Sequence, residues 1–399
     1  MRIGRRVAVT GKNGVASVPL GRRGAFVTSV QKGGYDGRAI RLSFRTRPRS
    51  TVRMYASAQQ WRMYGAVAAR TQAQTAIRIR PPFRVVWSRG LGGLIEFPAV
   101  VSDGVAYIGN DRETIRALDL RDGSVLWRHD IRGGKMASSP AVWRDALVVH
   151  GMDGVVRVLR RADGRELWRW NAGSPIESSP AVRRGIDVFG TWSGRIVALD
   201  LRRRRVVWSR YDGCKITSSP AVSRRLLALG DYCGRLVVLD ARSGQLRWTR
   251  SVNGRVYGTP AIAGGRIFVP SPTGGSLTAF STTGRYLWRH QFGAYVYSSP
   301  AASTGRVFVG DYAGRLTALS AATGAVRWSV PTGGAVSGAA VVVDGVAYAG
   351  SFSHRIVGAD VRTGKVLVTF PHGEYVPVSG AGTRLLLHGY SRIYAVVRR

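Results

Sequence analysis

Tyr295-Val296-Tyr297-Ser298-Ser299-Pro300-Ala301 is the stretch that decides the fold, because copies of it recur along the chain. The prolines of the copies lie about 40 residues apart, at Pro98, Pro140, Pro180, Pro220, Pro260 and Pro300, with degenerate copies at Ala340 and Gly380. A repeat of this length must be interpreted before any other feature of the sequence.

Each unit reads as four short strands joined by turns. In the quoted copy the first strand starts at Pro300-Ala301-Ala302, and the others are Arg306–Val309, Leu316–Leu319 and Val326–Ser329. β-branched and aromatic residues between glycines favour strands, and no stretch of a unit keeps a helical period. Four-stranded sheets repeated around an axis make a β-propeller, and a linear solenoid is the alternative.

The two ends of the repeat array complement each other. Phe83–Trp87 reads as a fourth strand without the first three, and the unit near Gly380 stops after a third strand at Ile393–Val396. If the first completes the second, the ring closes and no sheet edge is left open. We therefore expect an all-β fold: an eight-bladed β-propeller over residues 83–399, closed by an N-terminal strand that completes the C-terminal blade. A solenoid would have no use for such an arrangement.

Residues 1–50 do not fit the repeat, and 51–82 read as a linker. Asn13-Gly14 between short apolar runs predicts a hairpin, and Gly24–Val30 and Ala39–Phe44 predict further strands. This segment resembles the later part of an immunoglobulin-like β-sandwich of bacterial surfaces; an irregular β-rich arm is the alternative. Half a sandwich cannot bury a core, so we expect a truncated start. No secretory signal or apolar run long enough to cross a membrane is visible.

The formal net charge is +38 and comes almost entirely from arginine. A GC-rich genome, which encodes arginine wherever the surface needs a cation, would explain this charge without a function. A surface held against anionic lipid or wall polymer would explain it with one. The arginines are scattered and form no basic helix, so nucleic acid is a weak inference.

Four features of the sequence carry a family resemblance: Ala198-Leu199-Asp200, Leu239–Gly244 with Trp248, the Ser-Ser-Pro-Ala steps and Trp61-Arg62-Met63-Tyr64-Gly65. They resemble the repeat of the pyrroloquinoline-quinone-like (PQQ-like) propellers, which include quinoprotein dehydrogenases and non-catalytic BamB-like scaffolds. The resemblance covers roughly residues 58–399. It implies that a fourth-strand tryptophan docks on the turn of the neighbouring blade, here Trp87, Trp127, Trp168, Trp208, Trp248, Trp288 and Trp328, with Val368 in the eighth place.

In the enzymes of this family the resemblance implies a quinone in the central funnel, beside two adjacent cysteines, a calcium ion and an aspartate base. This chain has no adjacent cysteines, no haem-attachment motif and no acids at calcium-loop spacing. Its inter-strand connections are also short and repetitive, whereas catalytic sites need loops. We expect no enzyme activity, no cofactor and no metal; a PQQ-dependent dehydrogenase with calcium is the alternative.

Cys214 and Cys233 are the two cysteines. If the flanking strands turn at Ser223-Arg224, paired residue numbers sum to 447, as do these two. A disulfide and two free thiols both remain open, and a disulfide would indicate an oxidising compartment.

Two sets of segments should meet at one end of the propeller: those before each first strand and those between second and third strands. They differ between blades where the rest repeats, and they carry Lys135, Glu177, Trp192, Lys215, Tyr232, Arg255, Tyr257, Tyr295, Tyr297, Tyr312 and Tyr375. Aromatics and charges on short loops suit recognition of a peptide or glycan, although packing between loops would also explain them. We expect a monomeric scaffold of the cell envelope that binds a protein or polymer partner through this face. A basic module that binds anionic lipid or wall polymer is a further alternative.

Overall fold

The computed structural model describes residues 2–3, 6–11, 15, 24–44, 52–131 and 133–399. The chain divides into two compact units, Met1–Gln60 and Trp61–Arg399. Each unit is described by itself.

The first unit contains one antiparallel sheet in the order β2-β1-β3-β4. Its strands are β1 (Arg2–Ile3), β2 (Arg6–Val7), β3 (Gly24–Val30) and β4 (Arg38–Phe44). A 3-10 turn, η1, covers Ser57–Gln59. The two longer strands agree with those predicted, whereas the predicted Asn13-Gly14 turn lies outside the described residues.

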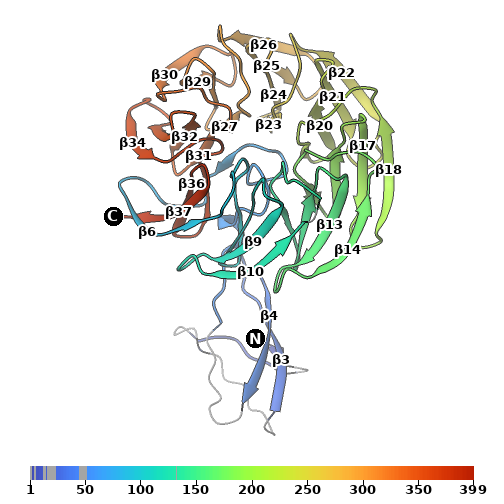
Figure 1. Ribbon diagram of the computed structural model, residues 1–399, viewed down its shortest axis with the longest axis vertical. Helices are drawn as coiled ribbons and strands as arrows, with labels where there is room; N and C mark the ends of the chain where they lie inside the picture. The colour runs from blue at the N-terminus through green and yellow to red at the C-terminus, as the bar shows by residue number, and fades with distance from the viewer. Residues whose placement is uncertain (1, 4–5, 12–14, 16–23, 45–51, 132) are drawn as a thin grey trace. The chain divides into compact units, whose positions relative to one another are not determined.

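The second unit is an eight-bladed β-propeller, as predicted (Figure 1). Seven blades are four-stranded antiparallel meanders that are continuous in sequence, and the sheet of the seventh gains a fifth, parallel strand, β5 (Ala73–Gln74). In chain order, blades 1 to 7 are β7–β10 (Val100–Ser102, Val105–Gly109, Thr114–Asp119, Val125–Asp130), β11–β14 (Ala141–Trp143, Ala146–His150, Val155–Arg160, Glu166–Asn171), β15–β18 (Ala181–Arg183, Ile186–Gly190, Arg195–Asp200, Arg205–Tyr211), β19–β22 (Ala221–Ser223, Leu226–Gly230, Arg235–Asp240, Leu246–Ser251), β23–β26 (Ala261–Ala263, Arg266–Ser271, Ser276–Ser281, Tyr286–Gln291), β27–β30 (Ala301–Ser303, Arg306–Gly310, Arg315–Ser320, Val326–Pro331) and β31–β34 (Val341–Val343, Val346–Ser351, Arg355–Asp360, Val366–Pro371).

Blade 8 closes the ring with strands from distant parts of the chain. It consists of β35 (Val378–Ala381), β36 (Arg384–His388), β37 (Arg392–Arg398) and, as its outer strand, β6 (Phe83–Gly90). β6 pairs antiparallel with β37, and Trp87 lies opposite Ala395. The predicted closure is therefore confirmed: β6 completes the last blade, so the ring is closed.

Residues 61–74, the central segment, lie inside the ring (Figure 1, light blue across the middle). Their backbone carbonyls accept hydrogen bonds from the inner strands of six blades. The acceptor and donor pairs are Trp61 with Val101, Arg62 with Val142, Ala68 with Val222, Ala69 with Ile262, Thr71 with Ala302 and Gln72 with Val342. At its end, β5 (Ala73–Gln74) pairs in parallel with β31. This differs from the linker expected over 51–82, and the second unit starts at Trp61 rather than Phe83.

Arg70 fixes the central segment to the ring. Its side chain is fully buried, and it donates to the backbone oxygens of Tyr64, Ser179, Pro180 and Pro220. Burial lowers the pKa of Arg70 to about 10, so the guanidinium stays charged at neutral pH. Charge-assisted bonds of this kind are roughly twice as strong as neutral ones.

The repeated Ser-Pro step links neighbouring blades. The backbone N–H of Ser139 donates to Oγ of Ser179 (3.1 Å), and Ser179 donates in turn to Ser219 (2.9 Å). The chain continues through Thr259 to Ser299. A hydroxyl is needed at this position because it satisfies the buried N–H of the preceding blade.

The tryptophans bridge neighbouring blades at the outer edge. Each of six indole N–H groups donates to a backbone carbonyl of the next blade: Trp87 to Leu120, Trp127 to Arg161, Trp208 to Ala241, Trp248 to Thr282, Trp288 to Ala321 and Trp328 to Val361. The ring of Trp87 lies on Gly123, where a Cβ atom would come within 2.5 Å of it. Val368 faces blade 8, whose third and fourth strands come from opposite ends of the chain, so no continuous turn exists there for a tryptophan to dock on.

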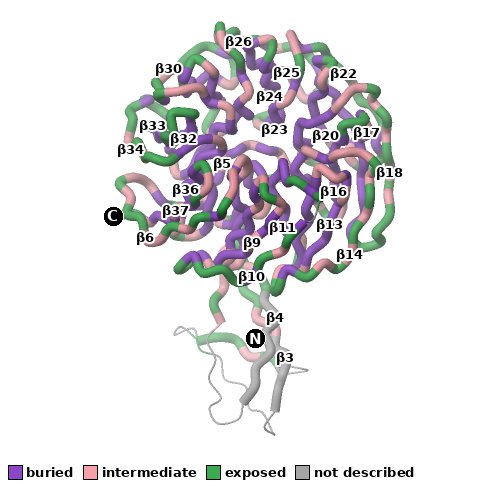
Figure 2. The backbone as a smooth tube through the Cα atoms, in the orientation of Figure 1, coloured by how far each residue is buried: buried purple, intermediate pink, exposed green. Residues whose placement is uncertain are grey.

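Burial follows this layered arrangement, since inner strands are buried and outer strands are exposed on one face (Figure 2). β12 is buried at every residue, whereas β14 alternates between intermediate and exposed positions. Among the described residues, no helix is long and apolar enough to span a membrane.

Candidate functional site

The segments before the inner strands and the turns between second and third strands meet at one end of the ring and enclose a cavity. Its volume is about 390 Å³. Its base includes Tyr64 of the central segment, whose hydroxyl donates to Oγ of Ser299 (3.2 Å). Its walls include Glu96, Phe97, Glu177, Thr217, Tyr232, Tyr257, Tyr297, Tyr375 and Val376. We call it the funnel cavity.

The structure brings the eleven residues predicted for this face to one end of the ring. Five of them line the funnel cavity: Glu177, Tyr232, Tyr257, Tyr297 and Tyr375. The other six lie beside these. Trp192 contacts Glu177, Lys215 contacts Tyr232 and Arg255 contacts Tyr257. Tyr295 and Tyr312 both pack against Tyr297, and Lys135 is close enough to Glu96 to affect its pKa.

Sequence reasoning missed Tyr64, Glu96 and Phe97. Tyr64 belongs to the segment interpreted as a linker. Glu96 and Phe97 precede Pro98 and so occupy the segment before the first inner strand, but this copy lacks the Ser-Ser pair that marks the segment in later copies. The third residue before the repeat proline was a usable signal, since Glu177, Thr217, Tyr257 and Tyr297 all occupy that position and all line the cavity.

Aromatic rings form a continuous arc around the rim of the cavity. Ring centroids are 4.5 Å apart for Tyr232 and Tyr257, 5.6 Å for Tyr257 and Tyr297, and 4.8 Å for Tyr297 and Tyr312. Phe352 continues the arc from Tyr312 to Tyr375, at 6.0 and 5.6 Å. The arc spans blades 4 to 8 and presents large, rigid side chains that lose little conformational entropy when a ligand binds.

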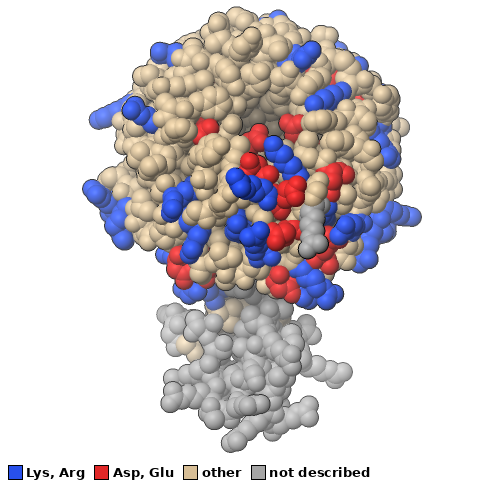
Figure 3. Space-filling view, viewed as in Figure 1, with Lys and Arg blue, Asp and Glu red and all other residues tan. Residues whose placement is uncertain are grey.

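The charged residues that line the cavity are Glu96 and Glu177, in a chain with 60 Lys and Arg against 22 Asp and Glu. Burial and repulsion from Glu177 raise the pKa of Glu96, and Lys135 offsets only part of this. Figure 3 shows the hollow at the middle of the ring with acidic side chains around it, and charged side chains gather over the blades of β9–β14 more than over β24–β26. The cavity therefore has an aromatic side and a carboxylate side.

At the rim of the cavity, the ammonium group of Lys215 lies in a notch between the rings of Trp192 and Tyr232. Nζ of Lys215 lies 3.4 Å from the ring centroid of Trp192 and 4.8 Å from that of Tyr232. The indole N–H of Trp192 donates to Glu177 (3.0 Å). This arrangement combines cation–π attraction with a nearby carboxylate.

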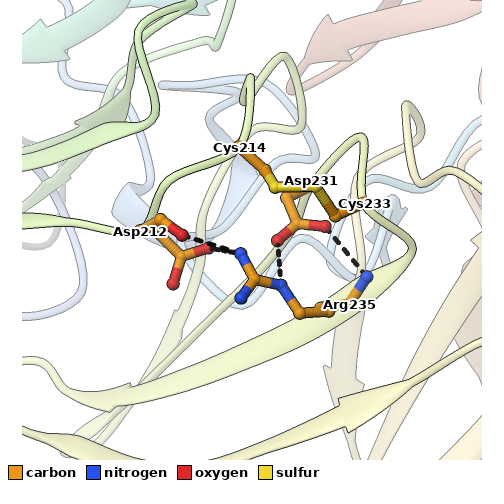
Figure 4. The surroundings of a disulfide bond; sticks show 5 residues. All are labelled: Asp212, Cys214, Asp231, Cys233 and Arg235. Carbon is orange, nitrogen blue, oxygen red and sulfur yellow. Dashed lines mark hydrogen bonds and ion pairs between the residues drawn. A yellow bond between two sulfur atoms is a disulfide. The ribbon is translucent and has the colours of Figure 1, made fainter.

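A disulfide joins Cys214 and Cys233, the residues next to Lys215 and Tyr232 (Figure 4). It therefore holds the segment before β19 against the turn after β20. The ladder register sums to 449 rather than the expected 447, with Ser223 opposite Leu226, so the turn is one residue later than we assumed. The bond forms beyond the ladder, where the register does not determine the spacing.

Arg235 stabilises the same corner by pairing with Asp212 and Asp231, both at 2.8 Å (Figure 4). Burial, together with a hydrogen bond that the protonated Asp212 carboxyl donates to Asp231, raises the pKa of Asp212 to about 6. The two carboxylates share the guanidinium of Arg235 and stabilise the loops around the disulfide. Neither carboxylate lines the funnel cavity.

The lining of the funnel cavity differs from the quinone-and-calcium site that the family resemblance implies. Its two carboxylates come from Glu96 and Glu177, on the segments before blades 1 and 3. Among the described side chains, no group of three or more His, Cys, Asp or Glu could hold a metal ion. The disulfide joins residues 19 apart rather than adjacent ones.

Comparison with known proteins gives one family and two kinds of relative. A family model described as outer membrane protein assembly factor BamB matches residues 48–212 and 193–399. BamB of Yersinia pestis is 29% identical over 83 residues, which cover 19% of this chain and 21% of that protein. The 1-butanol dehydrogenase (cytochrome c) of Thauera butanivorans is 29% identical over 133 residues, which cover 29% of this chain and 19% of that protein. The chain thus matches about a fifth of the length of these curated relatives.

Solved structures of both kinds share the fold. Quinohemoprotein alcohol dehydrogenase from Comamonas testosteroni superposes with a TM-score of 0.74 at 16% identity, over 86% of this chain and 81% of that one. BamB from Moraxella catarrhalis superposes with a TM-score of 0.68 at 17% identity, over 80% of this chain and 98% of that one.

Proposed function

The chain belongs to the BamB-like family of PQQ-repeat β-propellers, and from this premise we propose that it is a non-catalytic scaffold that binds a protein partner through the funnel cavity. The observation that carries the proposal is the aromatic arc next to Glu96 and Glu177. Rigid tyrosines on short loops suit an extended polypeptide, and carboxylates among aromatic rings favour a basic side chain within it. Lys215 in its Trp192 notch is an example of the same chemistry within the chain.

The proposed compartment is the cell envelope. The Cys214–Cys233 disulfide supports it, since such bonds persist in oxidising surroundings. The names of the BamB relatives, which refer to the outer membrane, point the same way.

The test is to pan a phage-displayed random peptide library on the full chain and to measure the affinity of the selected peptide. We expect selected peptides to contain Lys or Arg. Replacement of Tyr257 and Tyr297 together by alanine should weaken binding about tenfold or more, because stacking anchors dominate such interfaces. Tyr211→Ala is the matched control, because this tyrosine is 70% exposed on the outer strand β18. The affinity of this variant for the peptide should be unchanged.

Two results would overturn the proposal. One is an absence of enriched peptides, or peptides whose affinity falls equally in the control. The other is a shift of the quinone absorption spectrum together with a higher melting temperature when pyrroloquinoline quinone and calcium are added, which would favour the dehydrogenase alternative.

A further inference from the structure

A second cavity lies at the opposite end of the ring, between blades 3 and 4, and seven arginines and one acidic residue, Asp200, line it. Its volume is about 760 Å³. Blade 3 contributes Arg183, Arg184, Arg203 and Arg205. Blade 4 contributes Arg224, Arg225 and Arg242. We call it the arginine groove.

Most of this positive charge is not neutralised within the chain. Arg203 pairs with Asp200 (3.0 Å), and Arg225 pairs with Asp240 (2.8 Å). Arg183 donates to the backbone oxygen of Arg224. In the part of the chain that the structure describes, no ion pair with a carboxylate involves Arg184, Arg205, Arg224 or Arg242.

The other blades provide an internal control for a general excess of arginine. In six blades the turn between third and fourth strands has a glycine with positive φ: Gly123, Gly164, Gly244, Gly284, Gly324 and Gly364. In blade 3 the same position is Arg204, with φ 56°, inside the run Arg202–Arg205. A left-handed conformation costs an ordinary residue about 1–2 kcal/mol. Compositional bias acts on all blades alike, so it does not explain why blade 3 departs from the glycine that this turn favours. Arg204 itself packs over Trp168 of blade 2, whereas its neighbours Arg203 and Arg205 line the groove.

The walls of the groove are aliphatic below the arginines. Val188, Val206 and Val222 line it, and Val207 is 50% exposed beside them. Guanidinium groups bind phosphate oxygens in a two-pronged geometry that a lysine cannot reproduce. A purely polar polyanion would leave the aliphatic wall unused, whereas an anionic phospholipid offers both a phosphate and an acyl chain.

We propose that the arginine groove binds the headgroup phosphate of an anionic phospholipid and so holds this edge of the ring against a membrane surface. The site is separate from the funnel cavity, because turns between first and second strands lie at the opposite end from turns between second and third strands. A partner bound in the funnel cavity would therefore face away from the lipid.

The experiment is vesicle flotation with the full chain at near-physiological salt. Vesicles of phosphatidylcholine alone are compared with vesicles that also contain phosphatidylglycerol. The groove variant is Arg184→Gln with Arg205→Gln and Arg224→Gln. The matched control is Arg285→Gln with Arg327→Gln and Arg362→Gln, which removes the same charge from exposed positions on blades 5 to 7.

We expect wild type to float only with phosphatidylglycerol, the groove variant to lose binding about tenfold or more, and the control to stay within about twofold. Unchanged melting temperatures for both variants would show that they are folded. Equal loss in both variants would overturn the proposal, since net charge alone would then explain binding. It would also be overturned if soluble glycerol phosphate, an oligonucleotide or an acidic peptide bound the groove while vesicles did not.

Discussion

Arg70 at the centre of the ring and Arg205 at its edge have the same side chain in opposite surroundings. Arg70 is fully buried and donates to four backbone oxygens, whereas Arg205 is exposed and lines the arginine groove. The comparison shows that the net charge of +38 is not a single property. Arg70 holds the central segment to the ring, whereas Arg205 belongs to the groove that we propose binds phospholipid.

The largest effect that separates the two regions should come from Arg70→Met. Methionine fills a similar volume but leaves the carbonyls of Tyr64, Ser179, Pro180 and Pro220 without their donor, and each buried unsatisfied group costs about 1–3 kcal/mol. We expect a loss of at least 3 kcal/mol or so in the free energy of unfolding, measured by urea titration. Arg205→Met is the control and should change stability by less than about 0.5 kcal/mol. Similar losses for the two variants would contradict the distinction.

A second prediction concerns a buried histidine at the closing blade. His388 is 2% exposed, its Nε2 lies 3.2 Å from the backbone nitrogen of Ala99 in the segment that leads into blade 1, and burial lowers its pKa to about 4. The unfolded chain takes up this proton near pH 6.5, so the unfolded state binds more protons than the folded state between these values. Stability should therefore decrease as pH falls from about 6.5 to 4, by on the order of 3 kcal/mol from this group.

His388→Gln separates this contribution from the carboxylates that titrate in the same range. Its amide oxygen can still accept from Ala99. The difference in urea midpoint between wild type and variant should be greatest above pH 6.5 and shrink toward pH 4. A difference that stays constant with pH would show that His388 does not titrate as expected.

The smallest effect should be a gain, at Arg204. Arg204→Gly restores the residue that the equivalent turn has in six other blades and relieves a left-handed conformation at φ 56°. The guanidinium also lies 5.8 Å from the ring of Trp168, and the loss of that contact offsets part of the gain. We expect a rise in unfolding free energy of up to about 1 kcal/mol, seen as a higher melting temperature. A clear decrease would show that the contact with Trp168 outweighs the strain.

The sequence predicted the blades and their closure because both depend on local signals. Strand composition and turn glycines mark each unit, and the unmatched strand at Phe83–Trp87 had only one place to pair. The central segment was missed because its place depends on backbone hydrogen bonds to six separate blades, which leave no pattern in its own residues. Pro81, Pro82 and the lack of apolar runs made it resemble a linker.

The candidate site was predictable only where its residues lie on regular copies of the repeat. Residues on regular copies of the repeat, such as Tyr257 and Tyr297, could be placed by their distance from the proline. Glu96 belongs to the Pro98 copy, which lacks the Ser-Ser pair, and Tyr64 belongs to the central segment, so neither could be placed before the ring was known. The sequence predicts the blade 4 turn at Ser223-Arg224, one residue before its place at Arg224-Arg225. Arg224 has a positive φ there, without a glycine to mark the turn in the sequence.

The pairing of β6 with β37 also has a consequence in time. Roughly 300 residues separate these strands, and at 5–20 residues per second a ribosome needs about 15–60 s to make them. During that interval β6 has an apolar side and unpaired backbone groups but no partner strand. Blade 8 of a nascent chain therefore cannot be completed until Arg392–Arg398 emerges, and Phe83–Gly90 has to wait for it as an unpaired strand.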